Sequence, residues 1–209
     1  MEAIRNYIRQ FEGDITHEVA QEVHKAGVVA WDIETSGLEW REDKIGTCQL
    51  YVPGNFIAIV KLKGSVPQNL RDLLSEPKIQ KIFHHALFDL RFMSYAWQVR
   101  PQNIKCTRIA AKLINISDTR EYGLKHLLHH YLGVEISKDE QISDWLAPHL
   151  TESQIIYAAQ DVFHLPKLLP HLERALEAGD LSHLAQQCFD HIPARVRLDI
   201  MGYPDVFVY

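Results

Sequence analysis

The chain has 209 residues, of which 46% are hydrophobic and 23% charged, and its 22 lysine and arginine residues against 27 aspartate and glutamate residues give a formal net charge of −5. No run reaches the roughly 18 apolar residues of a membrane span, the N-terminus lacks an apolar signal core, and three separated cysteines without a C-x-x-C pair favour the reducing cytoplasm. The acidic balance argues against a protein that coats long nucleic acid but permits a short nucleic-acid ligand held partly through metal ions.

The first part of the chain alternates between predicted helices and strands. A helix is expected over residues 3–11, and a second runs from the N-cap Thr16 to Gly27. Residues 28–35 are β-branched and aromatic and predict a strand, and strands 44–52 and 55–60, joined by a Pro-Gly turn, complete an antiparallel meander. After Pro67 we expect a helix that runs to residue 75, a strand 79–83, a helix 87–96, an extended piece 104–106 and a helix 108–114.

The last third of the chain is predicted to be helical. Helices are expected over residues 124–132, from Thr151 onward and over 181–188; Gln154 completes a capping box, and Pro166 should kink or end the second of these helices. No repeat or linker divides the chain, so a single domain over residues 1–209 is expected. The pattern predicts an α/β fold with a mixed sheet, three antiparallel strands plus parallel strands, flanked by helices.

Two carboxylates stand out on the predicted strand 28–35. Asp32 and Glu34 are two residues apart, so their side chains point to the same face of a strand that is otherwise apolar. Carboxylates placed in this way repel each other unless a cation lies between them, and a divalent metal with oxygen ligands is the simplest stabiliser. The alternative is a strand end whose acids reach solvent.

Two helices carry further candidate residues. Asp89 lies among apolar neighbours in the first turns of helix 87–96, where it either joins a site or pairs with Arg91 or a helix-terminal amide. Tyr157 and Asp161 are four residues apart, outside the apolar stripe of their helix, and therefore face one point in space. A carboxylate that binds metal and a phenol that orients water suit that arrangement, although such pairs are also common as surface hydrogen bonds.

Taken in order, Asp32-x-Glu34, Asp89 and Tyr157-x-x-x-Asp161 resemble the three motifs of the DEDD 3′–5′ exonuclease superfamily, in its tyrosine branch. The histidine branch would place histidine where Ile156 stands. Segments 106–113, 123–125, 143–145 and 184–190 resemble ribonuclease D-like proteins, most closely the nano-RNase C type. Ribonuclease D carries additional C-terminal helical domains, and for this sequence of 209 residues we expect the smaller type without them.

The resemblance implies an RNase H-like sheet and two-metal hydrolysis of the 3′-terminal phosphodiester. Asp32, Glu34 and Asp161 would hold one ion, with Asp32 also contacting the second ion and Asp89 completing the cluster. Tyr157 would orient the nucleophile. Mg²⁺ or Mn²⁺ suits these oxygen ligands.

The resemblance also implies substrate contacts. The Thr35 backbone, with Glu34, would hold the terminal 3′-hydroxyl, and Leu38 would wedge between the last two bases unless it only packs its loop. His84 and His85 either contact substrate or make structural hydrogen bonds. The candidates for substrate binding are Thr35, Leu38, His84, His85 and Arg108.

Charge along the chain bears on the length of the substrate. Residues 100–125 carry a net charge of +4 and residues 135–161 a net charge of −5. A small basic patch beside an acidic metal centre favours short oligonucleotides over a long duplex. The resemblance implies cleavage of very short RNA, including dinucleotides, to nucleoside 5′-monophosphates, and assembly into a homo-octameric ring. The alternatives are a DNA-directed or general 3′–5′ exonuclease and, less favoured, a silent nucleic-acid-binding module.

Two further features have no place in that chemistry. His126, His129 and His130 lie across helix 124–132 from its apolar stripe. His126 and His130 could hold zinc at an i, i+4 spacing, but without the glutamate of H-E-x-x-H a polar or interface face is favoured. The aromatic C-terminus, residues 202–209, is expected to pack on the body of the protein or on a neighbouring subunit.

Overall fold

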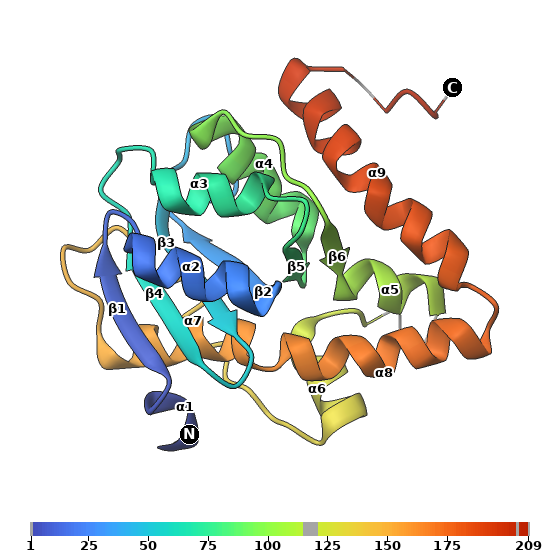
Figure 1. The fold of residues 1–209 in the computed structure, drawn as a ribbon, viewed down its shortest axis with the longest axis horizontal. Helices are drawn as coiled ribbons and strands as arrows, with labels where there is room; N and C mark the ends of the chain where they lie inside the picture. Colours follow the sequence, from blue (N-terminus) through green and yellow to red (C-terminus); the bar gives the residue numbers. More distant parts are fainter. Residues whose placement is uncertain (1, 115–120, 204, 209) are drawn as a thin grey trace.

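A six-stranded mixed sheet lies at the centre of the computed structural model, which describes residues 2–114, 121–203 and 205–208 (Figure 1). The strand order is β1-β4-β3-β2-β5-β6; β2–β3 and β3–β4 are antiparallel, and the other neighbours are parallel. This arrangement confirms the predicted fold class. The strands are β1 (Ile8–Glu12), β2 (Val28–Thr35), β3 (Ile45–Val52), β4 (Phe56–Lys61), β5 (Gln80–Phe83) and β6 (Ile104–Cys106).

Helices cover both faces of this sheet. Helix α7 lies across β2, β3 and β4, and α2 and α3 pack together on the opposite face (Figure 1). Helix α9 runs along α4, α5 and β6 at the far side of the molecule. The helices are α1 (Glu2–Arg5), α2 (His17–Ala26), α3 (Gln68–Ser75), α4 (Ala86–Trp97), α5 (Thr107–Ile114), α6 (Leu124–Leu132), α7 (Glu152–Phe163), α8 (Leu165–Ala178) and α9 (Ser182–Met201).

The N-terminal segment differs from its prediction. The helix expected over residues 3–11 ends at Arg5, and β1 begins at Ile8. The Ile57 amide donates to the Tyr7 carbonyl at 2.7 Å, and Ile8 pairs in parallel with Ile57. The open edge of β4 offers these residues a ladder of hydrogen bonds, which outweighs a local helical preference.

The termini of the other helices follow their sequence signals closely, with one exception. The Thr16 hydroxyl caps α2 by accepting from the Val19 amide, and Gly27 ends α2 with φ of +68°. Pro166 lies in the first turn of α8 and separates it from α7, as predicted. The helix expected over 181–188 is wrong at its end, because α9 continues to Met201. The apolar stripe that includes the buried Ala185 continues past position 188 with Phe189, Ile192 and Val196, which are also buried.

The loop between α6 and α7 is anchored to the sheet through Trp145. The Lys61 ammonium on β4 donates to the Trp145 carbonyl at 2.6 Å. Gly46, next to the start of β3, lies so close that a Cβ there would be 2.3 Å from the same oxygen. The Trp145 side chain is buried. Glycine at position 46 therefore permits the close approach of two backbones.

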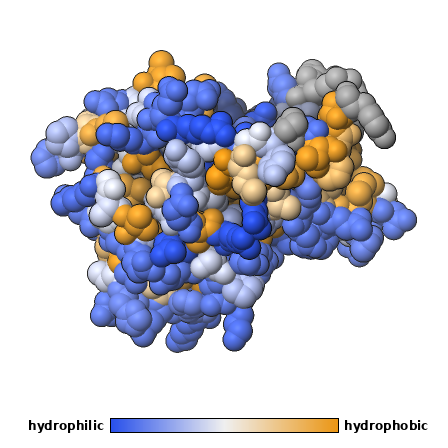
Figure 2. Space-filling model, turned by 90° about the horizontal axis from the view of Figure 1, so that it is seen from above, coloured by the Kyte–Doolittle hydropathy of each residue, from blue (hydrophilic) through white to orange (hydrophobic). Residues whose placement is uncertain are grey.

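The C-terminal tail is largely exposed. Phe207 and Val208 are each 72% exposed, and Phe207 contacts the His191 ring edge-on at 5.4 Å. Arg195 pairs with Asp205 at 3.1 Å. Pro204 and Tyr209 lie outside the described residues. On the face seen in Figure 2, hydrophobic residues gather on the right, the side on which α9 lies.

Within the described ranges, no helix combines the length and the apolar character needed to cross a bilayer. Cys48, Cys106 and Cys188 are free thiols.

We expect Gly46→Ala to destabilise the protein by about 1–3 kcal/mol, because its Cβ would overlap the Trp145 backbone. Thermal unfolding followed by circular dichroism measures this as a lower melting temperature. Gly123→Ala is the control for the exchange itself, since its Cβ would meet none of the described residues within 4 Å, its φ is negative, and only the modest cost of alanine at the N-cap of α6 is expected. Equal melting temperatures for the two variants would contradict the close approach.

Candidate active site

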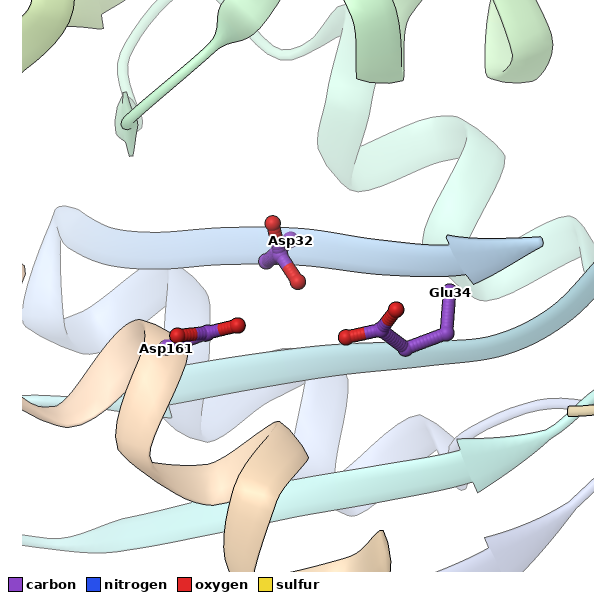
Figure 3. A group of neighbouring side chains, drawn as sticks. All are labelled: Asp32, Glu34 and Asp161. Carbon is purple, nitrogen blue, oxygen red and sulfur yellow. The ribbon is translucent and has the colours of Figure 1, made fainter. Parts of the chain in front are cut away.

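Three carboxylates converge between β2 and α7. Asp32 and Glu34 project from one face of β2, while Trp31 and Ile33, which alternate with them along the strand, are buried on the other. Asp161 comes from α7, and one oxygen from each carboxylate lies within 4.8 Å of the others. Figure 3 shows the carboxylates of Glu34 and Asp161 pointing toward each other beside Asp32. The structure thus brings together acids that are far apart in the sequence.

Asp89 lies next to this triad, on α4. Its side chain is buried, and its Oδ1 accepts a hydrogen bond at 3.3 Å from the Ile33 amide, between Asp32 and Glu34. Arg91, considered as a partner of Asp89, instead pairs with Asp199 of α9 at 2.7 Å. Asp89 therefore faces β2 and the other acids.

Lys138 is a site residue that sequence reasoning missed. Its ammonium donates to both oxygens of Asp161, at 3.0 and 3.3 Å, and to the Tyr157 hydroxyl at 3.4 Å. One feature of the sequence could have pointed to it, because Lys138 is the single lysine or arginine in the acidic stretch 135–161. Nothing in the spacing of a loop residue indicates that it folds back onto α7.

Burial and like charge dominate the electrostatics of the site. Burial raises the pKa of Glu34 to about 9 and that of Asp89 to about 7, and the neighbouring acid Asp161 adds to both shifts. Burial also raises the pKa of Asp32 and Asp161, which Lys138 opposes. Four crowded acids facing one ammonium favour a divalent cation, and their oxygen donors fit Mg²⁺ or Mn²⁺.

Tyr157 is held in place by its neighbours. It is buried, and its ring packs against Trp145 with centroids 5.8 Å apart. Burial, followed by the nearby acids, raises the pKa of the phenol, so it stays protonated and can donate a hydrogen bond. Trp145 is itself buried and serves as a core anchor behind Tyr157.

The loop after β2 carries two substrate candidates. Leu38 is 77% exposed, and its loop is braced by Asp43, which accepts from the Ser36 hydroxyl and the Glu39 amide, both at 2.9 Å. The Thr35 hydroxyl donates to the Gly37 carbonyl at 2.6 Å. Leu38 therefore projects from an ordered loop instead of packing into it.

His84, His85 and Arg108 form a second group of candidates. The Arg108 amide donates to the His84 carbonyl at 3.2 Å, and a His84 ring nitrogen lies 2.9 Å from the Thr107 hydroxyl. Burial, aided by the Arg108 cation, lowers the pKa of His84 to about 3 and that of His85 to about 4. Both rings are neutral at pH 7, and His84 makes the structural hydrogen bond considered as its alternative.

The histidine face of α6 is separate from this centre. His126 contacts Glu121 at 3.0 Å, and its ring stacks on His130. His129 lies 3.8 Å from Glu135. Within the part of the chain that the structure describes, the triad of Asp32, Glu34 and Asp161 is the only group of three side chains that could hold a metal ion. The zinc interpretation of α6 is not supported.

Comparison with known proteins assigns the chain to a family. A sequence profile of the 3′–5′ exonuclease family matches residues 12–177. Ribonuclease D of Serratia proteamaculans (strain 568) is 30% identical over 172 residues, which cover 82% of this chain and 46% of that protein. Ribonuclease D of Escherichia coli (strain K12) is 28% identical over 175 residues. The chain spans about half the length of these curated relatives.

Solved structures are similar to this chain as well, and one type of protein among them matches over nearly the full length of both chains. Brucella melitensis NrnC bound to pGG has 35% identity and a TM-score of 0.89, covering 97% of this chain and 98% of that one. The same protein with bound Mg²⁺ has a TM-score of 0.88 at 33% identity. Escherichia coli RNase D has a TM-score of 0.75 at 25% identity and matches 50% of that chain. The chain therefore belongs to the 3′–5′ exonuclease family of phosphodiester hydrolases, and is of the ribonuclease D and NrnC type.

The titration of Glu34 predicts a pH-dependent stability in chelator. Its pKa is about 9 in the folded protein against 4.5 for a free glutamate, so the folded state holds the proton more tightly. This contribution to stability is present at pH values below 4.5 and is lost as pH rises through 9.

The melting temperature of wild type relative to Glu34→Gln should therefore fall between pH 5 and pH 9 in EDTA, because glutamine does not titrate. Differential scanning fluorimetry across this range measures the difference. Groups whose titration does not depend on Glu34, such as His84, are common to the two proteins and cancel, whereas the difference includes the relief of Asp32, whose pKa Glu34 helps to raise. If the melting temperatures of wild type and Glu34→Gln changed with pH in parallel, Glu34 would not be crowded by buried charge.

Proposed function

We propose that the protein is a metal-dependent 3′–5′ exoribonuclease that hydrolyses short oligoribonucleotides, including dinucleotides, to nucleoside 5′-monophosphates in the cytoplasm. The observation that carries the proposal is the convergence of Asp32, Glu34 and Asp161 within 4.8 Å, with Asp89 and Tyr157 beside them. A similar protein, NrnC of Brucella melitensis, has been solved bound to pGG. The exonuclease domain is proposed to comprise residues 1–209.

Two divalent ions, Mg²⁺ or Mn²⁺, are proposed as cofactors, with Asp32, Glu34, Asp89 and Asp161 as their protein ligands. Such a pair supplies charge stabilisation to the attacking and leaving oxygens of an in-line displacement. The donor set supports this assignment, since its oxygens are of the kind these ions prefer and its crowded negative charge needs a cation.

The chain's own groups have separate tasks in this proposal. Tyr157, kept protonated, donates a hydrogen bond that orients the attacking water. Glu34 and the Thr35 backbone hold the terminal 3′-hydroxyl, and Leu38 inserts between the last two bases. The ordered loop and the exposure of Leu38 support that role. His85 and Arg108 contact the substrate, and His84 is held next to them by its hydrogen bond to the Thr107 hydroxyl.

Short substrates are supported by how charge is distributed. The basic stretch 100–125 reaches the candidate residues His84 and His85 through Arg108, whose cation lowers the pKa of both. Asp118 and Arg120, which belong to that stretch, lie outside the described residues. A patch this small suits a few phosphates better than a long backbone.

The proposal is tested by a time course on 5′-labelled RNA of two and twenty nucleotides, and on matching DNA, with Mg²⁺ or Mn²⁺ and with EDTA. We expect rapid, chelator-sensitive cleavage of the RNA dinucleotide and slow attack on the longer strands. Even degradation of long RNA or DNA from the 3′ end would indicate a general or DNA-directed exonuclease. Absence of cleavage would indicate a silent binding module.

Two variants assign this activity to the site. Asp161→Asn should lower kcat by several orders of magnitude with the fold retained, because a metal ligand is lost. Tyr157→Phe should lose less, about 10²-fold, because the carboxylates remain. Circular dichroism controls for folding. A fully active Asp161→Asn protein would refute the assignment.

A homo-oligomer, as an octameric ring, is proposed from the family resemblance. The exposed apolar side chains of the tail support it, because an isolated chain would leave them in water: Tyr203, Val206, Phe207 and Val208. The proposed contact is between the tail of one subunit and the body of its neighbour.

Truncation after Gly202 should reduce oligomer size and lower the melting temperature, since it removes this apolar surface. Size-exclusion chromatography with light scattering measures the first quantity and thermal unfolding the second. The double variant Lys25→Ala, Lys78→Ala, which removes charges remote from the tail, serves as the control. An unchanged oligomer size and melting temperature in the truncated protein would exclude the tail as a contact.

A further inference from the structure

Asp32 makes a short hydrogen bond to a residue of the neighbouring strand. The Gln49 Nε2 of β3 donates to Asp32 Oδ2 at 2.5 Å. Gln49 lies directly opposite Asp32 in the antiparallel register of β2 and β3, so the two side chains share a face of the sheet. The Gln49 side chain is completely buried. A buried amide is costly unless its hydrogen bonds are satisfied, so its presence against Asp32 requires an explanation.

Thr47 fixes the orientation of that amide. It lies opposite Glu34 in the same register and is also completely buried. Its hydroxyl donates to Gln49 Oε1 at 3.3 Å. An ionised carboxylate can only accept hydrogen bonds, and Oε1 can only accept as well, so the Thr47 proton and the Asp32 oxygen select the same orientation of the amide. The two hydrogen bonds are therefore donated in sequence, from Thr47 to Gln49 and from Gln49 to Asp32.

We propose that Gln49 is a positioning residue that fixes the Asp32 carboxylate for cation binding, and that Thr47 in turn positions Gln49. The hydrogen bond occupies one side of Oδ2 and prevents rotation of the carboxylate about its terminal torsion. The remaining lone pairs stay available toward Glu34 and Asp161. This inference rests on the proposed metal-dependent function, and it adds a layer of residues behind the acids that such a function requires.

The chemistry of an amide suits this position better than that of a charged side chain. A lysine or arginine at 49 would cancel the negative charge on Asp32 and compete with a divalent ion. A glutamate would add a further buried like charge to four already crowded acids. Glutamine donates a hydrogen bond while leaving the net charge of the cluster unchanged. Hydrogen-bond partners behind metal ligands commonly change metal affinity or activity by about 10- to 100-fold.

The test measures Mn²⁺ binding to the full chain. The free ion is detected through its electron paramagnetic resonance signal. Gln49→Met keeps length and volume but removes the donor, and we expect its Kd for Mn²⁺ to rise by about 10- to 100-fold. The Mg²⁺ concentration that half-activates cleavage should rise in parallel, with kcat at saturating Mg²⁺ less affected. Gln80→Met, the same exchange on β5, is the matched control and should bind as wild type.

Thr47→Val provides an independent second arm, since it removes only the hydroxyl that orients the amide. It should also raise the Kd for Mn²⁺, by a smaller factor than Gln49→Met does. If Gln49→Met fails to fold, as judged by circular dichroism, Thr47→Val decides alone. Wild-type Mn²⁺ affinity in a folded Gln49→Met protein, or in Thr47→Val as the deciding variant, would overturn the proposal. Failure of wild type to bind Mn²⁺ and to cleave RNA would instead overturn the proposed function.

Discussion

Repulsion among buried and half-buried carboxylates is the constraint around which this molecule is organised. Asp32, Glu34, Asp89 and Asp161 come from one strand and two helices. The fold holds them together although burial raises the pKa of all four and like charge adds to the shifts of Asp32, Glu34 and Asp89. Burial of unpaired charge opposes folding, so the apolar core must outweigh it. A site that is unfavourable in the empty protein is correspondingly favourable for a divalent cation, because the same charges that oppose each other attract the ion.

The sheet supplies the rigidity that such a cluster needs. Strand β2 lies in the interior of the sheet between β3 and β5. The stretch that carries Asp32 and Glu34 pairs with β3 on one side, and on the other side the Ile33 amide donates to the Asp89 carboxylate, because the pairing with β5 ends at Ala30. On α7, Tyr157 and Asp161 present a phenol and a carboxylate in fixed relation, and the buried ring of Trp145 supports the phenol from behind. Helix and strand thus meet through packed side chains instead of through flexible loops.

Local signals in the sequence predicted most of this architecture, and their failures share a cause. Strand β2 is found at its predicted bounds, and the caps at Thr16 and Thr151 act as predicted, because each depends on neighbours in the chain. The strand at Ile8 was missed because its partner, β4, is distant in sequence. Lys138 and Gln49 were missed for the same reason, since the contacts that make them part of the site are made only in three dimensions.

The loop that carries Lys138 is held at both ends. Gly133 ends α6 in the left-handed conformation, and Gln154 of α7 donates to the Ser143 hydroxyl at 2.9 Å and to the Asp144 carbonyl at 3.0 Å. The chain between these two fixed points has little freedom to slide. Its length is therefore as much a determinant of the active centre as its composition, because an insertion or deletion there would move the ammonium away from Asp161 without altering any residue of the site.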